Sequence, residues 1–198
     1  MIETKIKLAD CVSFVSRGIT PSYVFENGLC VVNQKCIRNG RLDFENARLH
    51  NQSKKRVPLE KLVKTNDILI NSTGVGTLGR VCQVNEISFP FCVDGHVTIV
   101  RPDSSKINPI FLGIMLHFLE DRIESLGEGS TGEIELYKDV LLDFEITKPS
   151  EAIQNKIANT LNKVDLLIEG KVKEIETLKE LKRKLMPSLL SDQIKDLF

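Results

Sequence analysis

The sequence predicts an α+β protein: a mostly β domain with a few helices over residues 1–150, then one long C-terminal α-helix and tail over residues 151–198. The first observation behind this prediction is that apolar runs of strand length alternate with turn residues as far as residue 148. The second is a highly charged amphipathic pattern from Ile153 to about Met186, long enough for a helix of roughly 50 Å. We expect this helix to pair as a coiled coil.

Within the first domain, strands are expected at Leu29–Val32, at Ile68–Ile70 and from Val93 to Val100, where Pro102 ends the run. Asn27-Gly28 and Asn39-Gly40 are typical of hairpin turns. Apolar residues then recur at helical spacing between Pro109 and Leu126, which predicts one core helix. Asn108 suits its cap, Pro109 its first position, and Gly127 follows it.

The long helix follows Pro149 and Ser150, and Ser150 suits the cap position. Lys171 and Lys182 interrupt its apolar seam, and Gly170 costs on the order of 1 kcal/mol relative to alanine. Because a lone helix gains most of its stability from packing, we expect a partner helix from a second copy or another chain. The alternative is that the helix folds back on its own domain. The seam positions of the a/d register are Ile157, Leu161, Val164, Ile168, Ile175, Leu178 and Leu185.

Composition restricts the class of protein. The 198 residues are 41% hydrophobic, enough for a core, and no apolar run is long enough to span a membrane. The N-terminus lacks the apolar stretch of a signal peptide. The five cysteines are scattered without Cys-x-x-Cys spacing, which favours buried thiols in a reducing compartment. We therefore expect a cytoplasmic protein.

The net charge of zero hides a local asymmetry. Between Lys35 and Lys64 there are nine basic residues against three acidic ones, whereas twelve acidic residues stand against four basic ones between Glu86 and Glu145. A basic segment of this kind predicts a phosphate-binding face, and the alternative is an ordinary solvated loop surface.

One motif matches a cofactor-binding pattern. Gly74-Val75-Gly76-Thr77-Leu78-Gly79 has the G-x-G-x-x-G spacing of dinucleotide sites, and a strand precedes it. That site requires a helix to follow, so that its N-terminus meets the phosphates. Here Arg80–Val84 has the composition of a strand. We therefore expect a glycine-rich turn between two strands, whose small residues allow a ligand to approach the backbone.

The matches to other catalytic templates are weak. His50, His96 and His117 lack metal-ligand spacing, and no Walker loop or Gly-x-Ser-x-Gly elbow occurs. The Asn-Pro-Pro-Tyr stretch of adenine methyltransferases is also missing. Pro102-Asp103 with Glu169-Gly170-Lys171 has nuclease-like spacing, but its second half falls on the predicted long helix. The sequence predicts no enzyme activity, no cofactor and no metal.

Four stretches, in order, resemble the specificity subunits of type I restriction-modification systems. They are Arg17-Gly18-Ile19-Thr20-Pro21, the segment Asp67–Arg80 with its strand and glycine-rich loop, Gly129–Ile146, and Ile153-Gln154-Asn155-Lys156-Ile157-Ala158 with Leu161 and Val164-Asp165. The resemblance implies a target recognition domain followed by a spacer helix. It also implies sequence-specific binding of double-stranded DNA without catalysis, and recruitment of adenine methyltransferase subunits and, through or with them, a nuclease-translocase subunit.

Typical members of that family carry two recognition domains and two spacer helices in a chain about twice as long. The resemblance therefore implies that this chain is either a half-subunit or a truncated product. If two copies pair their helices antiparallel, the homodimer reads two inverted half-sites at a fixed spacing.

The predicted DNA contacts lie in the basic segment and in the glycine-rich loop. Lys54, Lys55 and Arg56 are candidates for phosphate contacts. Arg38, Arg41 and Arg48 are candidates for base-edge or further phosphate contacts, because arginine pairs with guanine through two hydrogen bonds. The loop with Thr73, Gly74, Gly76 and Thr77 is expected to approach the DNA backbone.

Three alternatives are open. The chain could be a coiled-coil adaptor for protein partners with no DNA role, although an adaptor has no need of the basic segment. It could also be a truncated specificity subunit that competes for methyltransferase subunits and so modulates another complex. An enzyme acting on nucleic acid is the least favoured, because no catalytic constellation is present.

Overall fold

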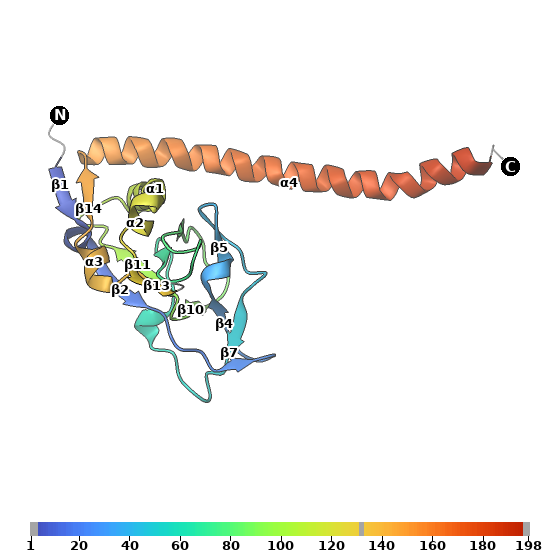
Figure 1. Cartoon of the computed structure of the whole chain (residues 1–198). Coiled ribbons are helices and arrows are strands. Elements are labelled where there is room, and N and C mark those ends of the chain that lie inside the picture. Colours follow the sequence, from blue (N-terminus) through green and yellow to red (C-terminus); the bar gives the residue numbers. More distant parts are fainter. Residues whose placement is uncertain (1–3, 131–132, 196–198) are drawn as a thin grey trace. The chain divides into compact units, whose positions relative to one another are not determined.

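The computed structural model describes residues 4–130 and 133–195, and the chain divides into two compact units, Met1–Ala158 and Asn159–Phe198. The strands of the first unit are β1 (Thr4–Lys7), β2 (Val12–Arg17), β3 (Tyr23–Val24), β4 (Leu29–Val32), β5 (Ile37–Arg38), β6 (Arg41–Leu42), β7 (Arg48–His50), β8 (Ile68–Asn71), β9 (Val81–Gln83), β10 (Phe91–Val93), β11 (Val97–Pro102), β12 (Glu128–Ser130), β13 (Glu133–Glu135) and β14 (Glu145–Lys148). The helices are α1 (Pro109–Phe118), α2 (Glu120–Glu124), α3 (Lys138–Leu142) and α4 (Glu151–Lys195), with short 3-10 turns η1 (Leu8–Cys11), η2 (Gln34–Cys36) and η3 (Leu59–Lys61). Figure 1 shows these helices and strands.

The centre of the first unit is an antiparallel sheet in the order β2-β11-β8-β9, and it is buried on both faces. Ile68 and Ile70 of β8 lie in one core, and Leu69 between them lies in the other. A strand buried on both sides has no polar face, which explains the uninterrupted apolar run in the sequence. The predicted strand at Ile68–Ile70 is confirmed.

Helices cover one face of this sheet and a second sheet covers the other. The first core joins the central sheet to α1, α2, α3 and the first turns of α4, where Ala158 is 1% exposed. The second sheet has the order β10-β4-β7-β3, with β10 parallel to β4. The expected α+β architecture, mostly strands with a long C-terminal helix, is confirmed.

Three local expectations are wrong. The single helix expected from Pro109 to Leu126 is broken at Leu119, whose φ of −99° and ψ of 15° lie outside the α-helical region, so α1 and α2 are separate and Phe118 is 82% exposed. The single strand expected from Val93 to Val100 is two strands in different sheets, because a turn at Asp94–His96 separates them.

The third wrong expectation is the hairpin at Asn27-Gly28. Strands β3 and β4 flank this turn, but both pair with β7 rather than with each other. By contrast, Asn39-Gly40 does join a hairpin, because Ile37 pairs with Leu42 and Arg38 with Arg41. Both turn residues have positive φ angles, 51° and 70°, as this hairpin turn requires.

Gly18 is explained by a close approach of two backbone segments. A Cβ atom at this position would lie 2.0 Å from the carbonyl oxygen of Val93 and 2.3 Å from that of Asp94. The Gly18 N–H donates to the Val97 carbonyl (3.0 Å), and the Ile19 N–H donates to that of Val93 (2.9 Å). Because these bonds hold the chain against the turn between β10 and β11, only glycine fits there.

Arg17, next to it, holds the closing strands to the central sheet. Its guanidinium forms an ion pair with Glu135 and donates to the Leu136 carbonyl (3.0 Å) and the Ser72 carbonyl (3.4 Å). Together the two residues give a structural reason for the Arg17-Gly18 sequence.

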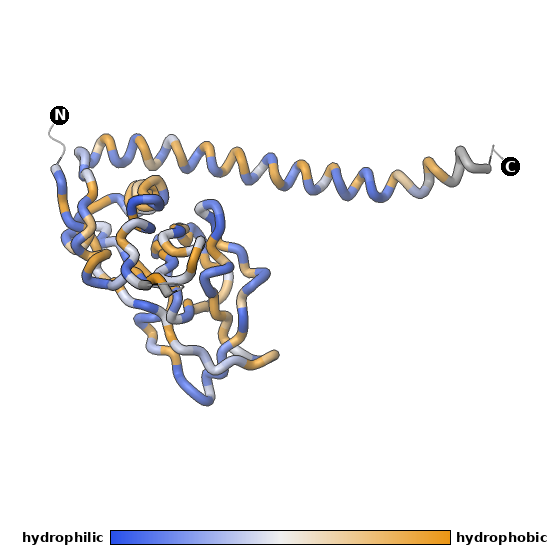
Figure 2. The backbone as a smooth tube through the Cα atoms, viewed as in Figure 1, coloured by the Kyte–Doolittle hydropathy of each residue, from blue (hydrophilic) through white to orange (hydrophobic). Residues whose placement is uncertain are grey.

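The second unit is the greater part of α4, which as a whole has 45 residues and a length of about 68 Å at 1.5 Å per residue. It continues past the expected end near Met186 and through Pro187 to Lys195. Figure 2 shows hydrophobic and hydrophilic residues alternating along it. Among the described residues, no helix is both long and apolar enough to cross a membrane.

The seam residues fall into two groups. Ile157 belongs to the first unit and packs against its core, partly buried. The other predicted seam residues lie in the second unit with side chains 40–56% exposed: Leu161, Val164, Ile168, Ile175, Leu178 and Leu185. Further apolar side chains, including Leu166, Leu167, Val172 and Leu181, are also exposed on this helix.

Candidate nucleic-acid interface

Arg48 of β7 lies in a polar cleft of about 460 Å³. Its guanidinium stacks over the ring of Tyr23 in the edge strand β3, with Cζ 4.9 Å from the ring centroid. This cation–π contact holds the positive charge at the wall of the cleft. The other lining residues carry amides, an imidazole, carboxylates and an ammonium group: Asn33, Gln34, Lys35, Glu45, Asn46, Asp94 and His96, together with Ala47. Hydrogen-bonding groups of this variety suit the edges of bases.

The glycine-rich loop after β8 meets this cleft at its edge. The hydroxyl of Thr73 lies 2.7 Å from Nδ1 of His96 and donates to Oε1 of Gln34 at 3.4 Å. Gly74 has a φ of +101°, and a Cβ atom there would lie 2.6 Å from the same Gln34 oxygen. The loop therefore needs glycine both for its backbone angle and for its contact with the cleft.

The far part of the same loop is more open. Thr77 donates its hydroxyl to the Thr73 carbonyl (3.2 Å) and so closes the loop on itself. Nothing lies within 4 Å of a Cβ atom built on Gly76, so this position faces open space. The loop joins β8 to β9, as expected for a turn between two strands and unlike a dinucleotide site.

Asp94 is the buried carboxylate of the cleft, only 4% exposed. Burial raises its pKa above the usual value, while the N–H of His96, which donates to it at 2.9 Å, and the charge of Arg48 partly offset this effect. A charged Asp94 therefore opposes folding at neutral pH and is tolerated through those two partners.

We expect Asp94→Asn to raise the melting temperature at pH 7, because an amide oxygen still accepts the His96 N–H without the cost of burying a charge. A carboxylate with a raised folded-state pKa destabilises the folded protein fully above that pKa, and the penalty disappears as pH falls from there to the ordinary pKa of aspartate. The advantage of Asp94→Asn should therefore shrink over this range and vanish below it. Thermal unfolding of both proteins from pH 3 to pH 8 checks this. A melting temperature lowered equally at every pH would contradict it.

Arg38 and Arg41 lie elsewhere, opposite each other on the β5–β6 hairpin. Arg38 and Asn39 line a second hollow of about 600 Å³ with Arg80, His117 and Glu120. This hollow shares no lining residue with the Arg48 cleft. The segments that lead into and out of this hairpin, residues 33–35 and 45–46, do line the Arg48 cleft. They are joined by a hydrogen bond in which Asn33 Nδ2 donates to the Asn46 carbonyl (2.6 Å).

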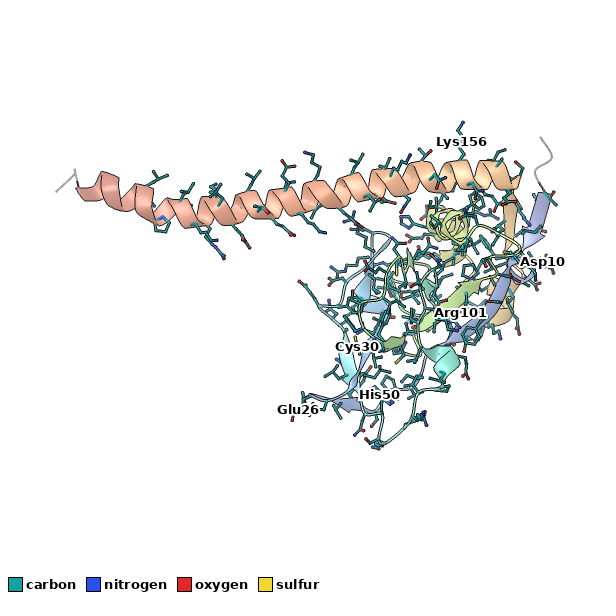
Figure 3. The ribbon with its side chains drawn as sticks, turned by 180° about the vertical axis from the view of Figure 1, so that it is seen from behind. Asp10, Glu26, Cys30, His50, Arg101 and Lys156 are labelled. Carbon is teal, nitrogen blue, oxygen red and sulfur yellow. The ribbon has the colours of Figure 1, made fainter. Side chains whose placement is uncertain are left out.

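Lys54, Lys55 and Arg56 form a third surface, a loop after β7 in which all three side chains are exposed. The buried His50 holds this loop, because its Nδ1 accepts from the Ser22 N–H (2.9 Å) and its Nε2 lies 2.6 Å from the Lys55 carbonyl, which can only accept. Figure 3 shows His50 at the start of this loop. The three charges therefore stand on an ordered segment.

The structure thus places Thr73 and Gly74 against Gln34 and His96, which line the Arg48 cleft. The other predicted basic residues, Arg38, Arg41, Lys54, Lys55 and Arg56, do not line this cleft. Sequence reasoning did not select Tyr23, Gln34, Asp94 or His96 as binding residues, although the side chain of His96 is exposed at the cleft. No local motif marks these residues. The only signal available was their position beside turns and strand ends, where binding residues are common.

Burial also accounts for the chemistry of the cysteines. Four are buried and Cys30 is half-buried, and all five are free thiols. Burial raises the pKa of Cys11 to about 11 and that of Cys92 to about 12, so both stay protonated at neutral pH. Across the part of the chain that the structure describes, no group of three His, Cys, Asp or Glu residues is arranged to hold a metal ion.

Comparison with known proteins gives consistent matches. Residues 19–180 match the family described as "Type I restriction modification DNA specificity domain". A putative type I restriction enzyme MjaX specificity subunit from Methanocaldococcus jannaschii is 31% identical over 135 residues, which cover 68% of this chain and 30% of that protein.

Solved structures share the fold at lower identity. The S subunit of a type I restriction-modification system from M. genitalium gives a TM-score of 0.62 at 20% identity, covering 86% of this chain and 41% of that one. The HsdS subunit from Thermoanaerobacter tengcongensis gives 0.57 at 16% identity, covering 85% and 38%. A chain from a study of type I R-M complex assembly and conformational transition gives 0.63 at 22% identity, covering 91% and 43%. The chain spans less than half the length of each of these proteins.

Proposed function

The chain belongs to the family of type I restriction-modification DNA specificity domains, and from this membership we propose that it recognises one half of a bipartite DNA site without catalysing a reaction itself. The observation that supports DNA recognition best is the Arg48 cleft, where a cation, amides and an imidazole are gathered beside a glycine-rich loop. In this proposal the recognition domain occupies residues 1–150, and residues 151–198 form the spacer helix and tail.

The three basic surfaces take different roles in the proposal. Lys54, Lys55 and Arg56 contact phosphates, because they are exposed on an ordered loop and carry no acidic partner among the described ion pairs. Arg48 reads base edges from the cleft, with Thr73, Gly74, Gly76 and Thr77 placing backbone next to the DNA. Arg38 and Arg41 contact bases or phosphates from the hairpin.

The long helix supplies the second part of the proposal. Its exposed apolar stripe supports pairing with the same helix of a second copy, antiparallel, so that two recognition domains read inverted half-sites. The complex then recruits adenine methyltransferase subunits and, with them, a nuclease-translocase subunit.

Selection of DNA from a random duplex pool tests the proposal. The full chain would be purified with the adenine methyltransferase subunit of its own system and used to recover duplexes over several rounds. We expect recovery of two short inverted sequences at a constant spacing. Recovery of no preferred sequence while the chain still binds the methyltransferase subunit would favour a protein-interaction adaptor and would contradict DNA recognition.

We expect the pure chain to have a solution mass near twice 22.3 kDa, measured by light scattering after size exclusion. Ile168→Glu together with Leu178→Glu places charges in the seam and should return the mass to that of one chain, because buried unpaired charges oppose helix pairing. Lys173→Glu is the matched control, because position 173 lies on the opposite face of the heptad pattern. A single-chain mass for the unaltered protein at micromolar concentration would contradict the homodimer.

A further inference from the structure

Phe25 is the most exposed large apolar side chain among the described residues, with a relative exposure of 106%. It follows β3, the edge strand of the second sheet, and it belongs to none of the three hydrophobic cores. Tyr23, two residues earlier, is also exposed at 45%. Because the ring of Phe25 contributes nothing to the core, its position calls for an explanation outside folding.

The base of the Phe25 turn is anchored. Tyr23 pairs with His50 and Val24 with Leu49, so the strand that leads into the turn is fixed to β7. On the returning side, a Cβ atom on Gly28 would lie 2.8 Å from side-chain atoms of both Leu49 and Val24. Figure 3 places Glu26 at the end of this projecting segment, and Figure 2 colours the segment hydrophobic at its end. Phe25 therefore stands on a protrusion that is held firmly at its root.

One cation, Arg48, lines the groove that Phe25 belongs to. Phe25 lines this groove of about 680 Å³ together with Tyr23, Val24, Ala47, Arg48 and Leu49, and Arg48 is its only ionised side chain. The same Arg48 lines the polar cleft proposed to read bases. An aromatic ring exposed beside a cation fits a partner with both flat apolar surfaces and negative charge, which is the chemistry of stacked bases and phosphates.

Glu26 indicates how the protrusion would face such a partner. Its exposed carboxylate would be repelled by phosphates, so the turn is unsuited to lie along the DNA backbone. In a groove, by contrast, a carboxylate can accept a hydrogen bond from the amino group of cytosine. This favours an approach of the turn to base edges.

We propose that Phe25 is an apolar wedge that inserts its ring at a base step of the duplex recognised by this domain. The proposal rests on the DNA recognition proposed above and adds a residue and a mode of contact to it. Inserting a side chain between bases unstacks them, and this cost is recovered through the additional contacts of the distorted duplex. Base steps that unstack readily would then be favoured at this position even without a hydrogen bond to the base.

The first test uses the duplex selected by the unaltered complex. Phe25→Ala should weaken binding by about tenfold or more, the range found when an aromatic partner of a base is removed, whereas Phe25→Trp should retain affinity. Phe118→Ala is the matched control, because Phe118 is 82% exposed on α1 and plays no part in the proposal. Equal affinities for Phe25→Ala and the unaltered complex would overturn the wedge.

A second measurement identifies what Phe25 touches. A photoreactive benzoylphenylalanine at position 25 should crosslink to a DNA strand, and the same group at position 118 should not. With 2-aminopurine placed at successive positions of the duplex, one position should brighten on binding in a manner that Phe25→Ala abolishes. A crosslink from position 25 to the methyltransferase subunit instead of DNA would overturn the proposal.

The two proposals fail in distinguishable ways. If the unaltered complex selects no DNA sequence, the proposed function fails and the wedge fails with it. If the complex selects a sequence but neither the affinity nor the 2-aminopurine signal depends on Phe25, only the wedge is overturned.

Discussion

Arg101→Ala is expected to lower the free energy of unfolding by about 3–5 kcal/mol, the range for removing one partner of a buried ion pair. In the folded protein Nε of Arg101 donates to Oδ1 of Asp67 (2.8 Å) and Nη2 donates to Oδ2 (2.7 Å). The Asp67 side chain is 0% exposed and that of Arg101 15%, so the variant would leave a carboxylate buried without its cation. Figure 3 labels Arg101 within the domain.

The guanidinium also ties the loop before β8 to the central sheet. It donates to the carbonyls of Leu62 (3.1 Å) and Glu60 (3.3 Å) and stacks over the Phe14 ring at 5.0 Å. Equilibrium unfolding in urea measures the loss. Lys7→Ala is the control, because it removes an ion pair with Asp143 whose side chains are 55% and 68% exposed, and it should change stability little. Similar losses for the two variants would contradict a structural role for the buried pair.

Adding Asp67→Leu to Arg101→Ala separates the cost of an unpaired charge from the loss of packing. The second substitution removes the buried carboxylate, so the double variant should recover part of the lost stability. A double variant that is less stable than Arg101→Ala alone would show that Asp67 acts mainly through its other bond, in which Oδ2 accepts the Lys64 N–H (2.8 Å).

The triple variant Lys54→Ala, Lys55→Ala, Arg56→Ala is expected to reduce DNA affinity and to flatten its salt dependence. Each phosphate contact contributes about 0.9 to the slope of log affinity against log salt concentration, so the slope should become shallower by roughly 2 to 3. The defect should therefore be larger at low salt than at high salt. Binding titrations of the selected duplex at several salt concentrations measure it.

Two observations indicate that this variant changes the surface charge without disturbing the fold. The three side chains are exposed, and the loop is held through backbone groups by His50 and Asn51, so folding should be unaffected. The variant Lys5→Ala, Lys106→Ala, Lys138→Ala is the matched control, because it removes the same charge from other exposed positions. An unchanged slope in the first variant, or an equal change in both, would show that this loop does not contact phosphates.

Periodicity predicted the long helix and the β8 strand because both signals are local. A strand buried on both faces is apolar at every position, as Ile68 to Ile70 are. In α4 the apolar residues recur at heptad spacing between charged residues, so the helical pattern is visible in the sequence itself. The break at Leu119 was not predictable in this way, because the helical spacing of apolar residues continues across it: Leu119 and Ile123 both pack in the first core.

The candidate site was predicted less well, and for a related reason. The basic segment was correctly seen as a local excess of charge, but its members lie on three surfaces, because a β-hairpin carries Arg38 and Arg41 away from Arg48. The cleft itself is assembled from η2, β7 and the turn before β11, which are separated along the chain. Only the folded sheet order places Gln34 beside Thr73 and His96.

The pairing of β1 with β14 brings the two ends of the first domain together, which bears on how the domain can be exchanged between related genes. Thr4 to Lys7 run antiparallel to Glu145 to Lys148, so the polypeptide between them leaves and returns at a single two-stranded ladder, immediately before α4 begins. Residues 8–144 are therefore a cassette with adjacent ends. A genetic exchange of this cassette would need to preserve that ladder and the core residues that seat the first turns of the helix. If the domain recognises DNA as proposed, such an exchange would replace the recognition surface in one step and leave α4 in place.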